Sequence, residues 1–319
     1  MVLGTTVLLL VVAVDATSTK EEMELTPFGW YPVSCVRRLG RGQRLVHRLA
    51  DKIDVMDEFG EVLSSSESKA HCLAHSAKMA ASRHQTSENG WLDYVEFYPP
   101  RSAAYFAGVY EVPKNPPLSE DQVLFYFIGM ENMKDTSGMG VTILQPVLTW
   151  GNGQEGWTFA AWNCCPVGEA TTSNYITGLK AGDLIYGNVT VDYAAETATV
   201  GARLLNASSS NGGDSSEAAL SFDKEVSLTV QGELRTFDWL DITHEVYSVA
   251  SCDEFAKTDV IISDLDARDE RGDSFVPDWN DATGNTDCDG KQTITDNSWT
   301  LHHDITAHVD FNGVRTRRR

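Results

Sequence analysis

The sequence has few positive charges for its length. Its 319 residues include 25 Lys and Arg against 46 Asp and Glu, which gives a formal net charge of −21. Residues 18–90 carry 10 basic and 10 acidic side chains, whereas residues 91–319 carry 15 basic and 35 acidic ones. A body with this charge repels nucleic acid and anionic membrane surfaces, so no nucleic-acid partner is expected. The negative charge fits two interpretations. One is solubility in a salty or carbohydrate-rich medium, and the other is function in acid, where part of the negative charge is neutralised.

Long apolar runs are also scarce. The run Val7–Val14 is about half the length of a membrane span and is followed by small residues, a pattern typical of a signal peptide over residues 1–17. No later segment is apolar enough to cross a bilayer, so no membrane span is expected. Two glycosylation sequons begin at Asn188 and Asn206, and the six cysteines are an even number. We therefore expect a secreted, extracellular, disulfide-bonded glycoprotein.

Several familiar chemical signatures are absent. There is no Gly-x-Ser-x-Gly elbow and no glycine-rich phosphate loop, so the usual serine-hydrolase signature is missing and no cofactor is expected. Three patterns match metal ligands only weakly, and each is more typical of an acidic loop, a solvated helix face or an exposed strand. They are the loop Asn285–Asp296, the pair His71 and His75, and the set His302, Asp304 and His308. No metal site is predicted.

Residues 18–90 differ from the rest of the chain. A basic stretch from Arg37 to Arg48 precedes a run of helical composition, Ser64–His84. Cys35 and Cys72 are placed to close this segment on itself. The segment is interpreted as an N-terminal subdomain or a pro-segment whose basic face meets the acidic body; a solvated basic face is the alternative.

From Trp91 onward the composition is that of strands, with aromatic and β-branched runs separated by Gly, Pro, Asn and Asp. In the last predicted strand, apolar residues from Trp299 to Phe311 alternate with polar ones. The stretches Ser208–Glu217 and Ser263–Asp289 are predicted to be loops. The strands are expected at Tyr105–Tyr110, Val123–Ile128, Val141–Trp150, Trp157–Trp162, Leu184–Val191, Thr197–Leu205, Val226–Val230, Leu240–Val249 and Trp299–Phe311. This spacing predicts an all-β fold for residues 91–319, a two-sheet antiparallel β-sandwich or jelly roll, preceded by a small segment with some helix.

Two of these strands carry polar residues in an otherwise apolar setting. Gln145 stands within an apolar strand, and a buried glutamine needs partners or must line a cleft. On the strand from Trp239 to Val249, alternation places Glu245 on one face with Asp241 and with aromatic neighbours. A carboxylate beside an amide can hydrolyse a bond, because the carboxylate acts as general base to water and the amide stabilises the developing oxyanion.

The order of these segments resembles the glutamic peptidase (eqolisin) family over about residues 123–255. The segments are the Ile143-Leu144-Gln145 strand, then Trp157–Trp162, then Leu179–Ile185, and finally an acidic strand that contains Trp239. The resemblance implies a secreted, acid-active endopeptidase with a sandwich of lectin and glucanase type and a catalytic Gln and Glu. By position, Gln145 matches the family's glutamine.

The catalytic glutamate is assigned to Glu245, the one Glu on its strand. The family has an acidic residue directly before a Trp, which here is Asp238 before Trp239. Two departures from the family allow a relative that kept the sandwich without peptidase activity. Pro146 follows the glutamine, which predicts an edge-like or bulged ladder, and Ala161–Pro166 contains no acid.

Two alternatives to a peptidase remain open. The first is a non-catalytic, extracellular module that binds carbohydrate or matrix, with tryptophans stacking on sugar rings; buried core tryptophans are the commoner arrangement. The candidate binding residues are Trp150, Trp162 and Trp239, with Trp157 as a further one. The second is glycoside cleavage by two carboxylates drawn from Glu131, Glu155, Asp241 and Glu245. The expected partner is a protein or polysaccharide in the extracellular space.

Cys164 and Cys165 are adjacent in the sequence. Adjacent cysteines rarely bond to each other, so each is expected to pair elsewhere, with Cys252 and Cys288 as the remaining partners.

Overall fold

A computed structural model describes residues 21–48, 52–80, 90–117, 121–133, 142–165, 168–206, 224–232, 236–282, 290–303, 309–310 and 314–315. The predicted signal peptide, the first five residues (285–289) of the Asn285–Asp296 loop, and Asp304 and His308 lie outside these residues. Within the described residues, no helix combines the length and the apolar character that a bilayer crossing requires.

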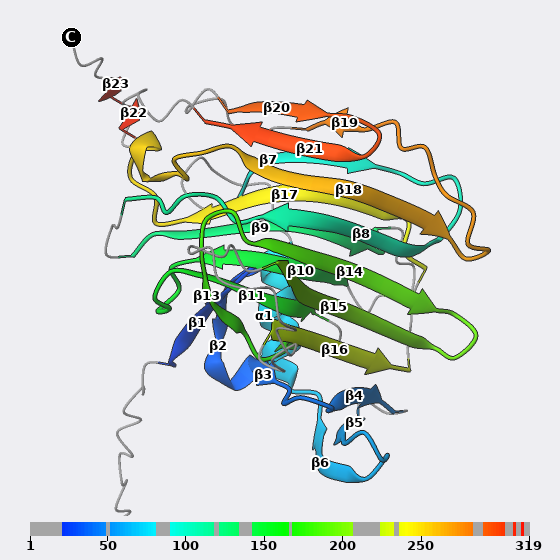
Figure 1. Ribbon diagram of the computed structural model, residues 1–319. Helices are drawn as coiled ribbons and strands as arrows, with labels where there is room; N and C mark the ends of the chain where they lie inside the picture. Colours follow the sequence, from blue (N-terminus) through cyan, green and yellow to red (C-terminus); the bar gives the residue numbers. More distant parts are fainter. Residues whose placement is uncertain are drawn as a thin grey trace, which may run out of the picture.

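Two large sheets face each other, which confirms the predicted β-sandwich (Figure 1). The first, here called sheet 1, has the order β19-β7-β17-β9-β10-β11-β12-β3, with β13 also paired to β11. Its strands are β3 (Val36–Arg38), β7 (Gly90–Phe97), β9 (Val123–Glu131), β10 (Ile143–Trp150), β11 (Trp157–Cys164), β12 (Ala170–Thr172), β13 (Ile176–Leu179), β17 (Trp239–Tyr247) and β19 (Asn280–Asp281).

The second, sheet 2, has the order β20-β21-β18-β8-β14-β15-β16-β4-β5-β6. Its strands are β4 (Arg44–His47), β5 (Lys52–Met56), β6 (Val62–Glu67), β8 (Ala103–Glu111), β14 (Leu184–Asp192), β15 (Thr197–Asn206), β16 (Glu225–Gln231), β18 (Val260–Asp269), β20 (Lys291–Ile294) and β21 (Ser298–His302). Two short strands, β22 (Val309–Asp310) and β23 (Val314–Arg315), pair separately.

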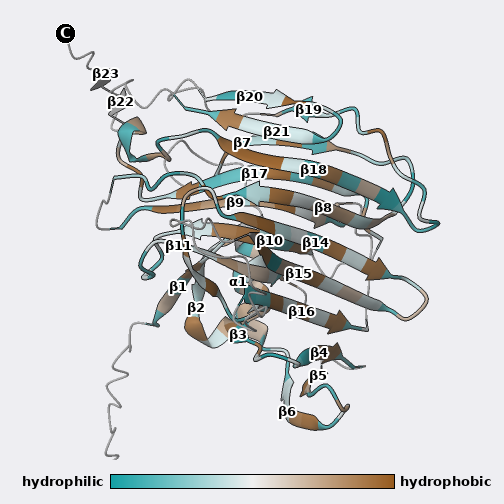
Figure 2. Ribbon diagram, viewed as in Figure 1, coloured by the Kyte–Doolittle hydropathy of each residue, from teal (hydrophilic) through white to brown (hydrophobic). Residues whose placement is uncertain are grey.

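The two sheets bury a common core, and sheet 1 is covered on its other side as well. The large apolar cluster between the sheets includes Phe106, Leu148, Phe159 and Ile185. A second cluster lies on the outer face of sheet 1, under the hairpin of β1 (Met23–Thr26) and β2 (Gly29–Pro32). Because both faces are covered, β9, β10, β11 and β17 are buried at every position, whereas β14 and β16 alternate. In Figure 2, hydrophobic and hydrophilic segments interchange along strands such as β14 and β16.

The N-terminal segment contributes strands to both sheets. β3 pairs parallel with β12, and β4 pairs parallel with β16, so these strands extend the sheets at their edges. The segment's helix is α1 (Ala70–Ala80), shorter than the helical run expected from composition, because Val62–Glu67 forms strand β6. Whether residues 18–90 form a separate subdomain or a pro-segment stays a prediction.

Two further predictions of local structure, for the acidic stretch after Ser263 and for the adjacent cysteines, are wrong. Ser263–Asp269 belongs to strand β18, and its alternation is hidden by a register shift between Ser263 and Asp266, where Asp264 has a φ of 51°. Cys164 and Cys165 are bonded to each other, and the peptide bond between them is cis. Both of their sulfur atoms lie against the Tyr31 hydroxyl, which packs there from the covering hairpin.

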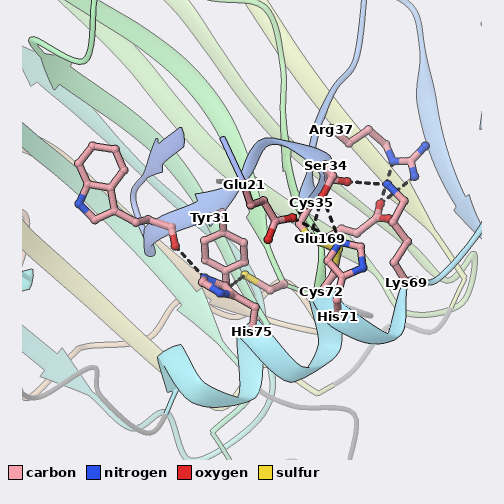
Figure 3. Close-up of a disulfide and its surroundings, with 12 residues drawn as sticks. Glu21, Tyr31, Ser34, Cys35, Arg37, Lys69, His71, Cys72, His75 and Glu169 are labelled. Carbon is pink, nitrogen blue, oxygen red and sulfur yellow. Dashed lines mark hydrogen bonds and ion pairs between the residues drawn. A yellow bond between two sulfur atoms is a disulfide. The ribbon is translucent and has the colours of Figure 1, made fainter. Parts of the chain in front are cut away.

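A disulfide between Cys35 and Cys72 fixes α1 to the turn after β2 (Figure 3). Polar contacts support the same junction: His75 lies 2.7 Å from the Trp30 carbonyl oxygen, and His71 lies 3.0 Å from the Ser34 hydroxyl. His75 therefore contacts the hairpin, and His71 contacts the turn that follows it.

Removing this disulfide through a Cys35→Ala/Cys72→Ala double substitution is expected to lower the free energy of unfolding by about 3–4 kcal/mol. The physical reason is that the bond closes a loop with a sequence separation of 37 residues and so restricts the unfolded chain. Denaturant unfolding without reductant measures the change. An unchanged midpoint would mean that the noncovalent contacts of α1 are sufficient.

Candidate active site on the outer face of sheet 1

Gln145 lies at the centre of sheet 1 on the face turned away from sheet 2. Its side chain is fully buried, and neither its amide nitrogen nor its amide oxygen has a hydrogen-bond partner among the described residues. Its neighbour on β11 is Trp162, whose indole nitrogen is also without a partner there. A buried amide with no protein partner carries a desolvation cost of about 1–3 kcal/mol, so its retention calls for a functional explanation.

The register of the strands places a carboxylate level with Gln145, in one row that crosses neighbouring strands at right angles to their direction. In the pairing of β10 with β9, Leu144 lies opposite Met130 and Val147 lies opposite Phe127. The same register sets Gln145 opposite Gly129. Gly129 in turn faces Asp241 on β17. Asp241 and Gln145 are therefore two strand spacings apart, roughly 10 Å between backbones, with Gly129 between them.

Gly129 is the residue that makes this row possible. A Cβ atom built on Gly129 would collide with both carboxylate oxygens of Asp241, so the Asp241 side chain lies over the glycine and toward Gln145. Asp241 is fully buried, and its Oδ1 accepts a hydrogen bond of 2.9 Å from the Thr243 hydroxyl. A glycine inside an apolar strand is the sequence signal of such a close approach, and the sequence prediction missed it.

Glu245 occupies the same face but a different row. It faces Phe125 on β9, four residues along β17 from Asp241, which is about 13 Å along the strand. Its Oε1 accepts a 2.5 Å hydrogen bond from the Tyr247 hydroxyl. The structure thus brings Asp241, rather than Glu245, next to Gln145, and the catalytic role of Glu245 stays a prediction.

Two further acids lie beside the Gln145 row. Glu131 is buried on the same face and pairs with Trp239 on β17 and with Ile143 on β10. The Asp238 backbone N–H donates to the Glu131 carbonyl oxygen at 3.0 Å. Burial raises the pKa of Tyr98, and the charges of Glu96, Asp238 and Glu131 raise it further, so an acidic field surrounds this edge of the row.

The backbone at Pro146 is held by a tyrosine from the other sheet. Proline has no N–H to donate to β9, yet β10 is a central strand rather than the predicted edge-like or bulged one. Tyr110 of β8 fills the gap: the Ile128 N–H donates to its hydroxyl at 2.9 Å, and that hydroxyl donates to the Pro146 carbonyl at 2.8 Å. Burial raises the pKa of Tyr110 and Asp241 adds to the rise, so the phenol remains a proton donor.

The predicted binding tryptophans are separated by the sheet. Trp162 and Trp239 lie on the outer face, where Phe28 contacts Trp162 edge-on at 6.1 Å and Trp91 stacks on Trp239 at 5.6 Å. Trp150 packs against Trp157 in the core between the sheets. All three predicted residues are buried, and their role in binding stays a prediction.

The described structure also has a cavity of about 700 Å³ elsewhere, lined in part by Leu39, Tyr175 and Val226. None of the residues of the Gln145 row lines this cavity. The β1–β2 hairpin closes the face that carries the row.

Replacing Tyr110 by phenylalanine is expected to lower the free energy of unfolding by about 1–3 kcal/mol, because the Ile128 N–H and the Pro146 carbonyl lose their partner in a buried ladder. Chemical denaturation measures this loss. Tyr186→Phe is a suitable control, since Tyr186 lies in the neighbouring strand β14 and contacts Tyr105 at a half-buried position. Equal effects of the two substitutions would contradict the role given to Tyr110.

Gly129→Ala tests the geometry of the row. The added methyl group has to displace the Asp241 carboxylate, so we expect a loss of stability and of any activity that needs Asp241 beside Gln145. Gly178→Ala is the control, because a Cβ there meets no atom within 4 Å, although its φ of 70° adds some backbone strain. A variant at position 129 with unchanged stability and activity would show that Asp241 does not depend on the glycine.

Comparison with known proteins finds similarity in structure only. No protein-family model matches the sequence, and no curated protein matches it. Among solved structures, the chain is similar to scytalido-glutamic peptidase with a peptide-based transition state analog, at 14% identity and a TM-score of 0.46. It is similar also to SCP-B, a member of the eqolisin family of peptidases in complex with the tripeptide Ala-Ile-His, at 14% identity and a TM-score of 0.44. Each similarity covers 68% of this chain and 100% of the other, and it is a similarity of fold to glutamic peptidases.

Proposed function

We propose that this protein is a secreted, acid-active endopeptidase in which Gln145 and Asp241 act together on a water molecule and a peptide bond. The observation that carries the proposal is the row Asp241–Gly129–Gln145, in which the residue between the carboxylate-bearing strand and the amide-bearing strand has no side chain of its own. Asp241 serves as general base to the water, and the Gln145 amide donates to the oxyanion that forms on the scissile carbonyl; the proton that Asp241 takes from the water then passes to the nitrogen of the leaving amine as the C–N bond breaks.

The surroundings of the pair favour this chemistry. Hydrogen bonds to a developing charge are worth more where water is excluded, and both residues are fully buried. The Gln145 amide N–H groups are not engaged by the described residues, so they need not break a protein hydrogen bond before they bind an oxyanion. Thr243 holds one oxygen of Asp241 and so fixes the orientation of its carboxylate.

A substrate has to reach a face that is closed in this structure. The β1–β2 hairpin packs on it through Leu25, Phe28 and Tyr31, and the Cys35–Cys72 disulfide fixes the hairpin to α1. We propose that movement or processing of the N-terminal segment opens the Gln145 row, which agrees with the interpretation of residues 18–90 as a pro-segment.

The test incubates the purified chain with a denatured protein substrate across a series from strongly acidic to neutral pH. Wild-type protein is expected to cleave, and Gln145→Ala and Asp241→Asn are each expected to reduce the rate at least a hundredfold, since each removes a group that acts in the transition state. Circular dichroism confirms that each variant is folded under the assay conditions.

Glu245→Gln decides between the two candidate carboxylates. We expect it to keep most of the activity, because Glu245 lies in another row of the sheet. A loss as large as that of Gln145→Ala, with Asp241→Asn still active, would assign the base to Glu245 instead. The same assay is run on protein that has been cut within residues 81–89, in case processing of the N-terminal segment is needed for access. Absence of cleavage by every form, cut or uncut, would reject the peptidase function.

A second substitution tests how the face opens. Phe28→Ala removes the edge-on contact with Trp162 and is expected to raise the initial cleavage rate several-fold by loosening the hairpin. Trp30→Ala, on the exposed side of the same hairpin, is the matched control and is expected to leave the rate unchanged. Equal rates in both variants and the wild type would show that the hairpin does not limit access.

A further inference from the structure

A second polar cluster lies on the opposite side of β17, between the two sheets. It consists of Asp93 on β7, His244 on β17 and His303, the residue directly after β21. All three side chains are buried, and their ligand atoms lie within 4.8 Å of one another. Asp93 and His244 come from sheet 1 and His303 from the end of a sheet 2 strand, so the cluster bridges the two layers.

Three atoms of this cluster form a nearly regular triangle. The His244 Nδ1 atom lies 3.2 Å from the Asp93 Oδ2 atom and 3.3 Å from the His303 Nε2 atom. The third edge, from His303 Nε2 to Asp93 Oδ2, is 3.5 Å. Four-coordinate zinc holds nitrogen and oxygen ligands at about 2.0–2.1 Å, which places neighbouring ligand atoms about 3.3–3.4 Å apart in a tetrahedron. An octahedral ion with similar bonds of about 2.1 Å would need edges nearer 3.0 Å.

Hydrogen bonds alone cannot link all three pairs of atoms in this triangle. Each imidazole nitrogen carries at most one hydrogen in the ring plane, and the Asp93 carboxylate oxygen only accepts when ionised. At most two of the three edges are then hydrogen bonds, and the third sets two hydrogens or two lone pairs against each other. A cation at the centre attracts all three atoms at once.

The surroundings hold the ligands in place. Tyr126 stacks on the His244 ring with centroids 4.5 Å apart, and Phe255 stacks on the His303 ring at 4.4 Å. Gly290 leaves space for the Asp93 carboxylate, since a Cβ atom at Gly290 would lie 2.5 Å from its Oδ1 atom. Rotamers fixed by packing are what a preorganised metal site requires.

We propose that Asp93, His244 and His303 bind a zinc ion that clamps the two sheets together. Two imidazoles and one carboxylate are a common donor set for zinc, and water completes a four-coordinate shell. Three protein ligands and a water leave one exchangeable position, as in catalytic zinc sites, but the burial of this cluster among aromatic side chains closes that position to substrate and favours a structural role. This proposal does not depend on the proposed peptidase function.

The test uses the full-length chain with its disulfides intact and without reductant, so that no thiolate competes for metal. After treatment with a chelator and its removal, isothermal titration with Zn²⁺ is expected to show one ion bound per chain, and zinc is expected to raise the midpoint of thermal unfolding. Asp93→Asn and His303→Gln are expected to weaken binding at least tenfold. His302→Ala is the matched control, because His302 is the exposed neighbour that contacts Asp259 rather than the cluster.

Titration of the wild-type chain with Co²⁺ gives a readout that needs no variant. A four-coordinate ion produces intense visible absorption bands, whereas a six-coordinate ion absorbs weakly, so intense bands that Zn²⁺ abolishes are expected. Absence of zinc binding by the wild type, weak octahedral-type Co²⁺ spectra, or equal affinities in His303→Gln and His302→Ala would each overturn the proposal.

Discussion

The hydroxyl of Tyr110 is the contact on which the centre of this sandwich depends. It receives the Ile128 N–H and donates to the Pro146 carbonyl, and so bridges these two backbone groups at the point where a proline interrupts the ladder of a central strand. Because Tyr110 belongs to sheet 2, the same hydroxyl also fixes the separation of the two sheets at this point. Gly187 of β14 leaves the space that Pro146 and Tyr110 occupy, since a Cβ atom there would lie 2.9 Å from each side chain.

This arrangement explains how a buried glutamine can stand in the middle of an apolar sheet. Gln145 directly precedes Pro146, and alternation turns its side chain away from the Tyr110 contact and toward the outer face. The backbone around the glutamine is thereby held from one side of the sheet, while its amide remains unengaged on the other. A functional amide needs such a rigid support, because hydrogen bonds aimed at a developing charge lose their value when the donor can move.

The sequence predicted the sandwich and most of its central strands because the physical signals there are local. Apolar runs and turn residues mark β8 to β11 and β14 to β17 without reference to the rest of the chain. β18 was missed because a bulge near Asp264 interrupts the alternation of an acidic strand. The pairing of β3 with β12 and of β4 with β16 joins segments far apart in sequence, and no local pattern reports it.

The candidate site was only half predictable for the same reason. Gln145 is conspicuous from its own strand, and alternation correctly placed Asp241 and Glu245 on one face of theirs. Which of these two acids meets the glutamine depends on the register of β17 against β9 and of β9 against β10. Register is set by packing across the sheet, and a shift of four residues along β17 would exchange the two acids without changing either pattern.

Alternation along β17 also separates the two polar clusters of the molecule. Asp241 faces outward with Gln145, whereas His244 faces inward with Asp93 and His303, so the thickness of sheet 1 lies between them. A substitution in one cluster therefore reaches the other only through the strand itself. Effects on sites without shared contacts are additive to within about 0.5 kcal/mol. If His303→Gln lowered peptidase activity as much as Asp241→Asn while the fold was unchanged, the two clusters would have to act as one site, and the assignment of a structural ion to one and hydrolysis to the other would fail.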